Sequence, residues 1–564
     1  MALRAPIDTG GGRPTSDTEL QVALRVVHRS GIVPPLSGLL DSDVGRPRTV
    51  SLLGFFVGAQ LNAMVRHHRG HLVEVARALN ALTDDQRHRL ELRNWDPEQT
   101  YDRIERLFVR LCSVLEEGHE AVIGGRSVRL DAGWFANSLG AAPIPDDLRE
   151  SGSVAVDGTD VETWGALHGD TATVQPDGET TPNPDAPPAK ARRAARAARV
   201  LGIGPDGRKI YTADPDARAG HRSATNSRPA GPYVGYELHL AVQTRSVRWT
   251  NGIDKTTLGP EVAGVITNLA LVPAGTHRTT AVVDRLIAAK HAGQPVDEVV
   301  WDPGYSLCRP ETGQWPLGQA GITATFQPVT HQRTERPFAG DARLIDGALY
   351  SALLPDDLVD LPMPPRGATE AGKVAYEAAF NRRARWRYVR HAGPDADGAT
   401  RWRCPFCAGL LRSRQIPATM RRSRTAPLEI LETDRCCTGI LTVQPAALPL
   451  WQRLLPGTTA WRISMGRRQV VESVNAAIKG AFVDLGRGFA RVLGQTKTTV
   501  LLAFTVAGFN LDRVRAFRAK HRRPGPEGPD GDQGPAPAAT RPKRRQGTWG
   551  QLLAADPGTP PPPD

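Results

Sequence analysis

The chain has 564 residues, of which 40% are hydrophobic and 23% charged, so it is long enough for several domains and a large buried core. Its 71 Lys and Arg residues outnumber 59 Asp and Glu residues, which gives a net charge of +12. That excess favours partners that carry phosphates, although a basic disordered tail would produce the same balance.

Two features of the sequence bear on membrane association and cellular location. The longest apolar run, 500–511, is interrupted by Thr505, Gly508 and Asn510 and is too short to cross a bilayer. The first ten residues lack the apolar segment of a signal peptide. We therefore expect no membrane association and a cytoplasmic, nucleoid-associated protein, whose six cysteines are reduced or bound to metal.

Apolar residues recur at helical spacing between Ser16 and Glu117, for example at Leu20, Ala23 and Val27. Residues 1–150 are therefore predicted to form an all-helical N-terminal domain. Composition alone makes it a helical bundle and does not locate a DNA-recognition helix.

A mixed α/β region is predicted over 151–335. Its first strand, 153–156, is apolar and leads directly into Asp157, with Asp160 as a second acidic residue nearby. We favour Asp157 because it follows Val156 directly. Residues 170–232 contain a loop-like stretch and the basic, alanine-rich segment 189–199. This segment suits a phosphate backbone and a solvated linker helix equally well.

The pattern of a sheet resumes after this insertion. Strands are predicted at 233–243, 261–272, 298–301 and 322–326, with a helix at 279–291. Counted from the first strand at 153–156, the fourth strand ends at Asp302, which opens the turn Asp302-Pro303-Gly304-Tyr305. Open sheets place their chemistry where strands end in turns, so Asp302 is the second candidate carboxylate.

An insertion is predicted at 336–460. It contains Cys404, Cys407, Cys436 and Cys437 in a basic segment rich in turn residues. Four thiolates can hold a structural Zn²⁺ tetrahedrally, although the adjacent second pair departs from the usual spacing. Four reduced thiols are the alternative, and the sequence leaves both open.

The second part of the α/β region, 461–520, is predicted to begin with a helix over 467–479 that Gly480 ends. Its Val470, Val471, Val474, Ala477 and Ile478 form one face, and Arg468, Glu472, Asn475 and Lys479 form the other. A buried helix follows at 498–517. The Pro-rich, basic tail 521–564 is predicted to be disordered.

The order Asp157, Asp302, Glu472 resembles the DDE transposases of the ribonuclease H-like superfamily. Within them it resembles the cut-and-paste insertion-sequence group with the signature Tyr-x2-Arg-x3-Glu-x6-Lys. Arg468, Glu472 and Lys479 match that spacing, while Met465 stands where the family has Tyr. Asp302-Pro303-Gly304-Tyr305 is similar to the family's Asp-x-Gly-Tyr segment.

The resemblance implies a ribonuclease H-like catalytic domain with a mixed sheet and flanking helices. It also implies that Asp157, Asp302 and Glu472 hold two Mg²⁺ or Mn²⁺ ions for phosphoryl transfer. Arg468 and Lys479 would hold the phosphates that flank the cut, with Asn475 in a supporting role. Tyr305 would stack on or hydrogen-bond to the DNA end, and a half-buried turn tyrosine is the equal alternative. Residues 1–150 would contain the region that binds the DNA ends.

The expected partners of such an enzyme are double-stranded DNA, both terminal inverted repeats and target, and a second copy of the chain in a homodimer assembled on DNA. Two alternatives remain open: a non-catalytic DNA-binding protein derived from a transposase, and a nuclease of the same fold without strand transfer.

Overall fold

The computed structural model describes residues 12–521, with gaps at 42–47, 66, 150, 168–199, 223–229, 250–255, 330–331, 334, 340–341, 363–367, 406–407, 409–439 and 449–450. The predicted basic segment 189–199 and the predicted disordered tail therefore lie outside the described residues.

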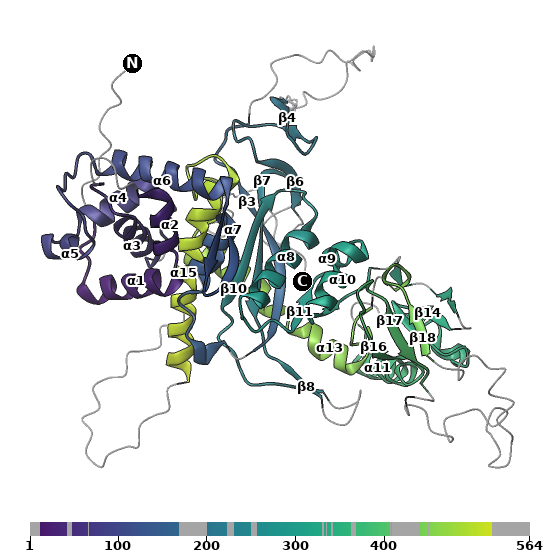
Figure 1. The fold of residues 1–564 in the computed structure, drawn as a ribbon. Helices are drawn as coiled ribbons and strands as arrows, with labels where there is room; N and C mark the ends of the chain where they lie inside the picture. The colour runs from purple at the N-terminus through teal and green to yellow at the C-terminus, as the bar shows by residue number, and fades with distance from the viewer. Residues whose placement is uncertain are drawn as a thin grey trace, which may run out of the picture. The chain divides into compact units, whose positions relative to one another are not determined.

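The N-terminal region is built mainly of helices, as predicted (Figure 1). They are α1 (Asp17–Ser30), α2 (Val33–Leu40), α3 (Leu52–Ala63), α4 (Leu72–Asn80), α5 (Asp84–Arg89), α6 (Thr100–Glu117) and α7 (Ala132–Ala141). Helix α1 starts at a capping box in which Ser16 and Glu19 satisfy each other's backbone N–H groups, and it ends at the left-handed Gly31.

The expectation of an all-helical domain is wrong in one place. Strands β1 (His119–Ile123) and β2 (Arg126–Leu130) form an antiparallel hairpin between α6 and α7. Its two turn residues, Gly124 and Gly125, both have positive φ, the backbone conformation that a tight two-residue hairpin turn favours. This glycine pair was the available sequence signal.

The α/β region contains a mixed sheet in the order β10-β7-β3-β11-β12. The strands are β3 (Ser153–Glu162), β7 (Gly231–Gln243), β10 (Ile266–Pro273), β11 (Glu298–Trp301) and β12 (Thr323–Phe326), and β6 (Arg218–Arg222) adds to β7. Strand β7 runs antiparallel to β3 and β10, whereas β11 runs parallel to both β3 and β12. Two short hairpins lie outside this sheet: β4 (Gly202–Ile203) with β5 (Lys209–Ile210), and β8 (Val247–Trp249) with β9 (Thr256–Leu258).

Helices flank this sheet. They include α8 (Arg278–His291), α9 (Pro303–Ser306), α10 (Gln314–Gln319), α13 (Thr459–Gly466), α14 (Gln469–Ala476) and α15 (Gln495–Lys520). The helix expected over 467–479 is shorter, and Gly480 does not end it, because a π-helical segment, η10 (Ala477–Phe482), continues from α14. A mixed α/β architecture with flanking helices is thus confirmed.

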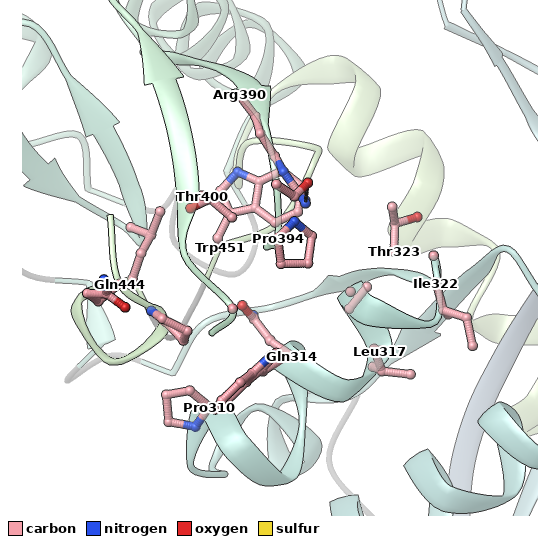
Figure 2. Close-up of a pocket in the computed structure, with 18 of the residues that line it drawn as sticks. Pro310, Gln314, Leu317, Ile322, Thr323, Arg390, Pro394, Thr400, Gln444 and Trp451 are labelled. Atoms are coloured by element: carbon pink, nitrogen blue, oxygen red, sulfur yellow. Dashed lines mark hydrogen bonds between the residues drawn. The ribbon is translucent and has the colours of Figure 1, made fainter. Parts of the chain in front are cut away.

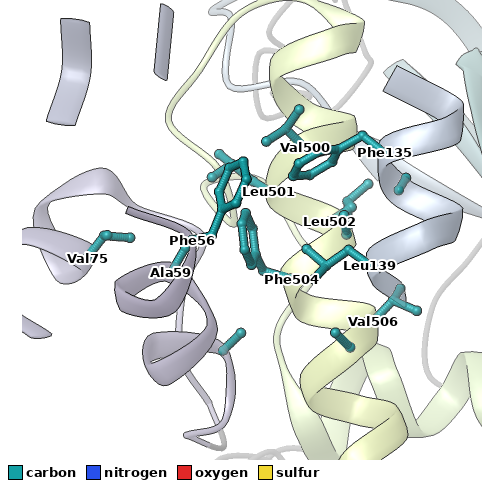
Figure 3. Packing of buried hydrophobic residues seen from close by; sticks show 14 of the residues in the cluster. Phe56, Ala59, Val75, Phe135, Leu139, Val500, Leu501, Leu502, Phe504 and Val506 are labelled. Carbon is teal, nitrogen blue, oxygen red and sulfur yellow. The ribbon is translucent and has the colours of Figure 1, made fainter. Parts of the chain in front are cut away.

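Helix α15 packs against both the N-terminal helices and the α/β region. Phe504 lies with its ring centroid 6.0 Å from that of Phe56 in α3 and 5.9 Å from that of Phe135 in α7 (Figure 3). On the same helix, Asn510 is fully buried and its amide bonds to both backbone groups of Ile266 in β10. One buried cluster therefore joins the N-terminal helices to the sheet.

The region between β12 and α13 has small antiparallel sheets and cores of its own. Strands β13 (Arg336–Pro337), β14 (Arg343–Ile345) and β15 (Ala348–Tyr350) form one sheet, and β16 (Val389–Ala392), β17 (Thr400–Arg403) and β18 (Ile440–Val443) form another. Helix α11 (Glu370–Ala384) lies between them in sequence. Arg383 of α11 is buried in an ion pair with Asp346. Figure 1 draws these elements in green.

Candidate active site

The first two candidate carboxylates are brought together by strand register. Strand β11 pairs with β3 in parallel from Glu298↔Ser153 to Trp301↔Val156. The residue that follows Trp301 is Asp302, and the residue that follows Val156 is Asp157. Because neighbouring strands lie roughly 5 Å apart, the two aspartates sit side by side where this pairing ends.

Asp157 does not end its strand, so the prediction that the first strand stops there is wrong. Strand β3 continues to Glu162 because its other edge stays paired with β7, with Asp157 opposite Leu240. Only the β11 side opens at Asp157. From Asp157 onward, β3 is therefore paired with β7 on one side and is no longer paired with β11 on the other.

Burial and negative charge act together on Asp157. They raise its pKa from 3.8 to about 6, first through desolvation and then through the charge of Asp302, with a smaller contribution from Glu472. The backbone N–H of Gly158 donates to Asp157 Oδ1 at 2.9 Å and partly opposes this shift. The site thus concentrates negative charge that its own hydrogen bonds do not balance.

Helix α14 carries the third carboxylate. Val471, Val474 and Ile478 are buried, as the predicted apolar face requires. On the other face the Glu472 side chain is about half exposed and forms an ion pair with Arg468, four residues earlier. Asn475 lies one turn further, is 8% exposed, and donates from Nδ2 to Asp157 Oδ2 at 3.3 Å.

The amide oxygen of Asn475 is buried and has no hydrogen-bond partner among the described residues. The same helix therefore offers Asp157 a neutral donor and, beside it, an unused acceptor. The structure shows a direct contact of Asn475 with Asp157, and the supporting role at the DNA expected from the sequence stays a prediction.

Lys479 is held by a carboxylate of the same region. Its Nζ lies 2.8 Å from Asp160 Oδ1, and Arg222 lies 3.5 Å from Asp160 Oδ2. Asp160, the rejected rival of Asp157, is thus an anchor for two cations. The expected DNA contacts of Arg468 and Lys479 stay predictions.

Tyr305 has no exposed surface. Its ring stacks on Trp301 at 5.6 Å between centroids, and its hydroxyl lies 2.6 Å from His239 Nδ1. Burial and the charges of Asp157 and Asp302 raise its pKa well above its ordinary value, so the hydroxyl stays protonated. A contact with DNA would require the ring to leave this packing.

Two charged residues that the sequence did not single out also border the aspartates. Glu237 of β7 is 6% exposed and pairs with Arg278 at the start of α8, with 2.9 Å between Oε1 and Nη2. Burial raises the pKa of Glu237, the charge of Arg278 opposes that shift, and the charges of Asp302 and Asp157 add to it. The alternating pattern of β7 hid Glu237, because a polar residue in such a strand normally faces solvent.

The donor set suits a hard divalent cation at the two aspartates. Asp302 Oδ1 is buried without a hydrogen-bond partner in the described chain, and burial and the charge of Asp302 raise the pKa of Asp157. Carboxylate oxygens are the ligands that Mg²⁺ and Mn²⁺ prefer. Glu472 would join them by exchanging its ion pair with Arg468. Over the described residues, no three acidic, His or Cys side chains are gathered closely enough to hold a metal as they stand.

The predicted zinc ligands fall largely outside the described residues. Cys404 is buried after β17, in a cluster with Tyr388 and Trp402. Cys407, Cys436 and Cys437 are not among the described residues. The zinc site stays a prediction.

A cavity of about 320 Å³ lies elsewhere, between α10 and the sheet β16-β17-β18 (Figure 2). Trp315, Trp402 and Trp451 line it, and the Arg390 guanidinium lies 4.9 Å from the centroid of the Trp451 ring. None of the three candidate carboxylates borders it, so an apolar cavity and an acidic edge are separate features of this chain.

Comparison of the chain with protein-family models, with curated proteins and with solved structures finds no match. Within the part of the chain that the structure describes, no helix has the length and apolar character needed to cross a membrane.

Proposed function

We propose that this protein is a metal-dependent DNA transposase, which cleaves and joins DNA ends by phosphoryl transfer at Asp157, Asp302 and Glu472. One observation carries the proposal. The parallel register that ends at Trp301↔Val156 brings together two aspartates that lie far apart in the sequence, and α14 presents Glu472 and Asn475 to the same edge.

The order of elements supports a ribonuclease H-like assignment. In that fold the first carboxylate lies on the first strand, the second follows the fourth strand, and the glutamate lies on a later helix. Along the chain, the path of the central sheet uses β3, β7, β10, β11 and β12. Asp157 lies on the first of these, Asp302 directly follows the fourth, and Glu472 lies on α14.

Each residue then has a role that its surroundings suit. Asp157 and Asp302 would hold the cations, and Glu472 would complete the set after leaving Arg468. When bound, two divalent ions polarise the scissile phosphate and lower the pKa of the attacking hydroxyl. Asn475 orients Asp157 through its amide, and Arg468, once released, offers its guanidinium to a phosphate oxygen.

The net charge of +12 adds a general attraction to nucleic acid. It acts at every phosphate and gives no preference for an end. Selection of terminal repeats must therefore come from other surfaces of the chain.

The test is a cleavage and strand-transfer assay on DNA that carries the sequences flanking the coding region. Wild-type protein with Mg²⁺ or Mn²⁺ should cut at the repeat ends and join them to a marked target. Asp302→Ala should bind the same DNA and do neither. Cutting without joining would identify a nuclease, and binding without metal-dependent cutting would identify a non-catalytic DNA-binding protein.

A further inference from the structure

The Glu237–Arg278 pair lies beside the two aspartates, and neither of its residues has a role in the proposed binding of metal by Asp157, Asp302 and Glu472. The Glu237 side chain is 8% exposed, whereas that of Arg278 is 39% exposed. The carboxylate is thus buried and its partner reaches the surface.

The two ends of the Arg278 guanidinium face different groups. Nη2 is tied to Glu237 at 2.9 Å. A Cβ placed on Gly304 would lie 3.2 Å from Arg278 Nη1 and 3.0 Å from Asp302 Oδ1, so both atoms border the same small space. The second nitrogen of the planar fork therefore points to the edge where Asp302 stands.

Two glycines make this approach possible. A Cβ on Gly158 would lie 2.8 Å from Glu237 Oε1, so any larger residue here would displace the Glu237 carboxylate from its place against β3, directly after Asp157. At Gly304 the contacts of a Cβ with Arg278 and Asp302 would be tight without being excluded, so glycine leaves both side chains their present positions. Both positions belong to the segments that carry the candidate carboxylates.

We propose that Arg278 contacts a non-bridging phosphate oxygen of the bound nucleic acid, and that Glu237 is the positioning residue that aims it. This rests on the proposed function and names a further substrate contact of the same site. A guanidinium suits the task because its fork can bind a carboxylate at one side and a phosphate at the other. Its positive charge also offsets the repulsion between the phosphate and the two aspartates.

The experiment measures binding of the full-length chain to a fluorescein-labelled, mixed-sequence DNA duplex by anisotropy, in Ca²⁺ and over a series of KCl concentrations. Arg278→Gln should weaken binding about tenfold and reduce the slope of log affinity against log salt by about 0.9, the loss of one phosphate contact. Arg278→Lys should keep the slope, since it keeps the charge.

Arg285 provides a matched control. It lies two turns further along α8, its side chain is 35% exposed, and it too pairs with a single carboxylate, that of Asp131 at 3.3 Å. Arg285→Gln should leave both affinity and salt slope unchanged.

The double variant Glu237→Gln/Arg278→Gln separates binding from structure. Arg278→Gln alone leaves the Glu237 charge buried without a partner and should lower Tm, and the second change should restore Tm without restoring the salt slope. If the double variant recovers both, or if Arg278→Gln binds with the wild-type slope, the contact does not exist. If wild-type protein itself shows no salt-dependent DNA binding, the proposed function fails first.

Discussion

Asp157→Asn should stabilise the metal-free protein above pH 6 while abolishing its chemistry. The carboxyl titrates at 3.8 in an unfolded chain and at about 6 in the folded one. A pKa that rises by about 2 on folding corresponds to about 3 kcal/mol of unfavourable free energy for the charged form in the folded protein. An asparagine at this position carries no charge and should recover most of that amount.

The direction of the pKa shift determines the pH range over which stability changes. Because the folded state binds this proton more tightly than the unfolded state, wild-type stability falls as pH rises from about 4 to about 6. The variant lacks this fall, so the difference in unfolding free energy should grow from near zero at pH 3 to about 3 kcal/mol at pH 7.

The substitution also fits its hydrogen bonds. The amide oxygen of the new side chain, like Asp157 Oδ1 which it replaces, would accept the 2.9 Å bond from the Gly158 N–H. The new amide nitrogen would meet Asn475 Nδ2, but a half-turn of the Asn475 amide brings its unpartnered Oδ1 into place as acceptor. The half-turn moves Asn475 Nδ2 to the position that its unpartnered Oδ1 now occupies, so the amide still has one unpartnered atom, as it has in the wild-type protein.

The assay is urea unfolding followed by tryptophan fluorescence at pH 3, 5 and 7, in the presence of EDTA. Addition of Mg²⁺ should then stabilise the wild-type protein and not the variant, since ligand binding to the folded state adds stability. A variant that is less stable than wild type at pH 7, or a difference that does not change with pH, would refute the electrostatic account of this site.

Three further predictions follow from named contacts. Ile478→Ala, at a fully buried position of η10, should lower the free energy of unfolding by about 2–5 kcal/mol in chemical denaturation while leaving the DNA salt slope unchanged. Lys479→Ala should reduce that slope by about one phosphate contact in an anisotropy titration, and an unchanged slope would mean that Lys479 serves only Asp160. Elemental analysis of protein purified without chelators should find about one zinc per chain if the four cysteines Cys404, Cys407, Cys436 and Cys437 bind it, and a zinc-free, folded protein would exclude that site.

Local sequence patterns predicted the elements well and their ends less well. The apolar run before Asp302 and the Pro303-Gly304 pair after it predicted a strand that ends in a turn. Strand β11 does end there, but the short helix α9 follows in place of a turn. At Asp157 the same reasoning failed, since strand length depends on pairing with a distant neighbour. Ladder bonds with β7 hold β3 in strand conformation as far as Glu162.

Long-range placement explains what the sequence could not predict about the site. Helical periodicity put Arg468, Glu472 and Asn475 on one face, but burial of Asn475 against Asp157 depends on how α14 crosses β3. Glu237 and Arg278 lie on elements with no motif, and their importance appears only when β7, α8 and the aspartates meet. Composition and periodicity carry no information about such tertiary contacts.

The most direct test of the central claim is Mn²⁺ binding, followed by electron paramagnetic resonance with the full-length protein and DNA from the flanks of its gene. Wild-type protein should bind about two ions per chain. Asp157→Asn and Asp302→Asn should each lose at least one, while Asp284→Asn, at an exposed position of α8, should lose none. Equal binding by all four proteins, or no binding by wild type, would contradict a metal site at the end of the β3–β11 pairing.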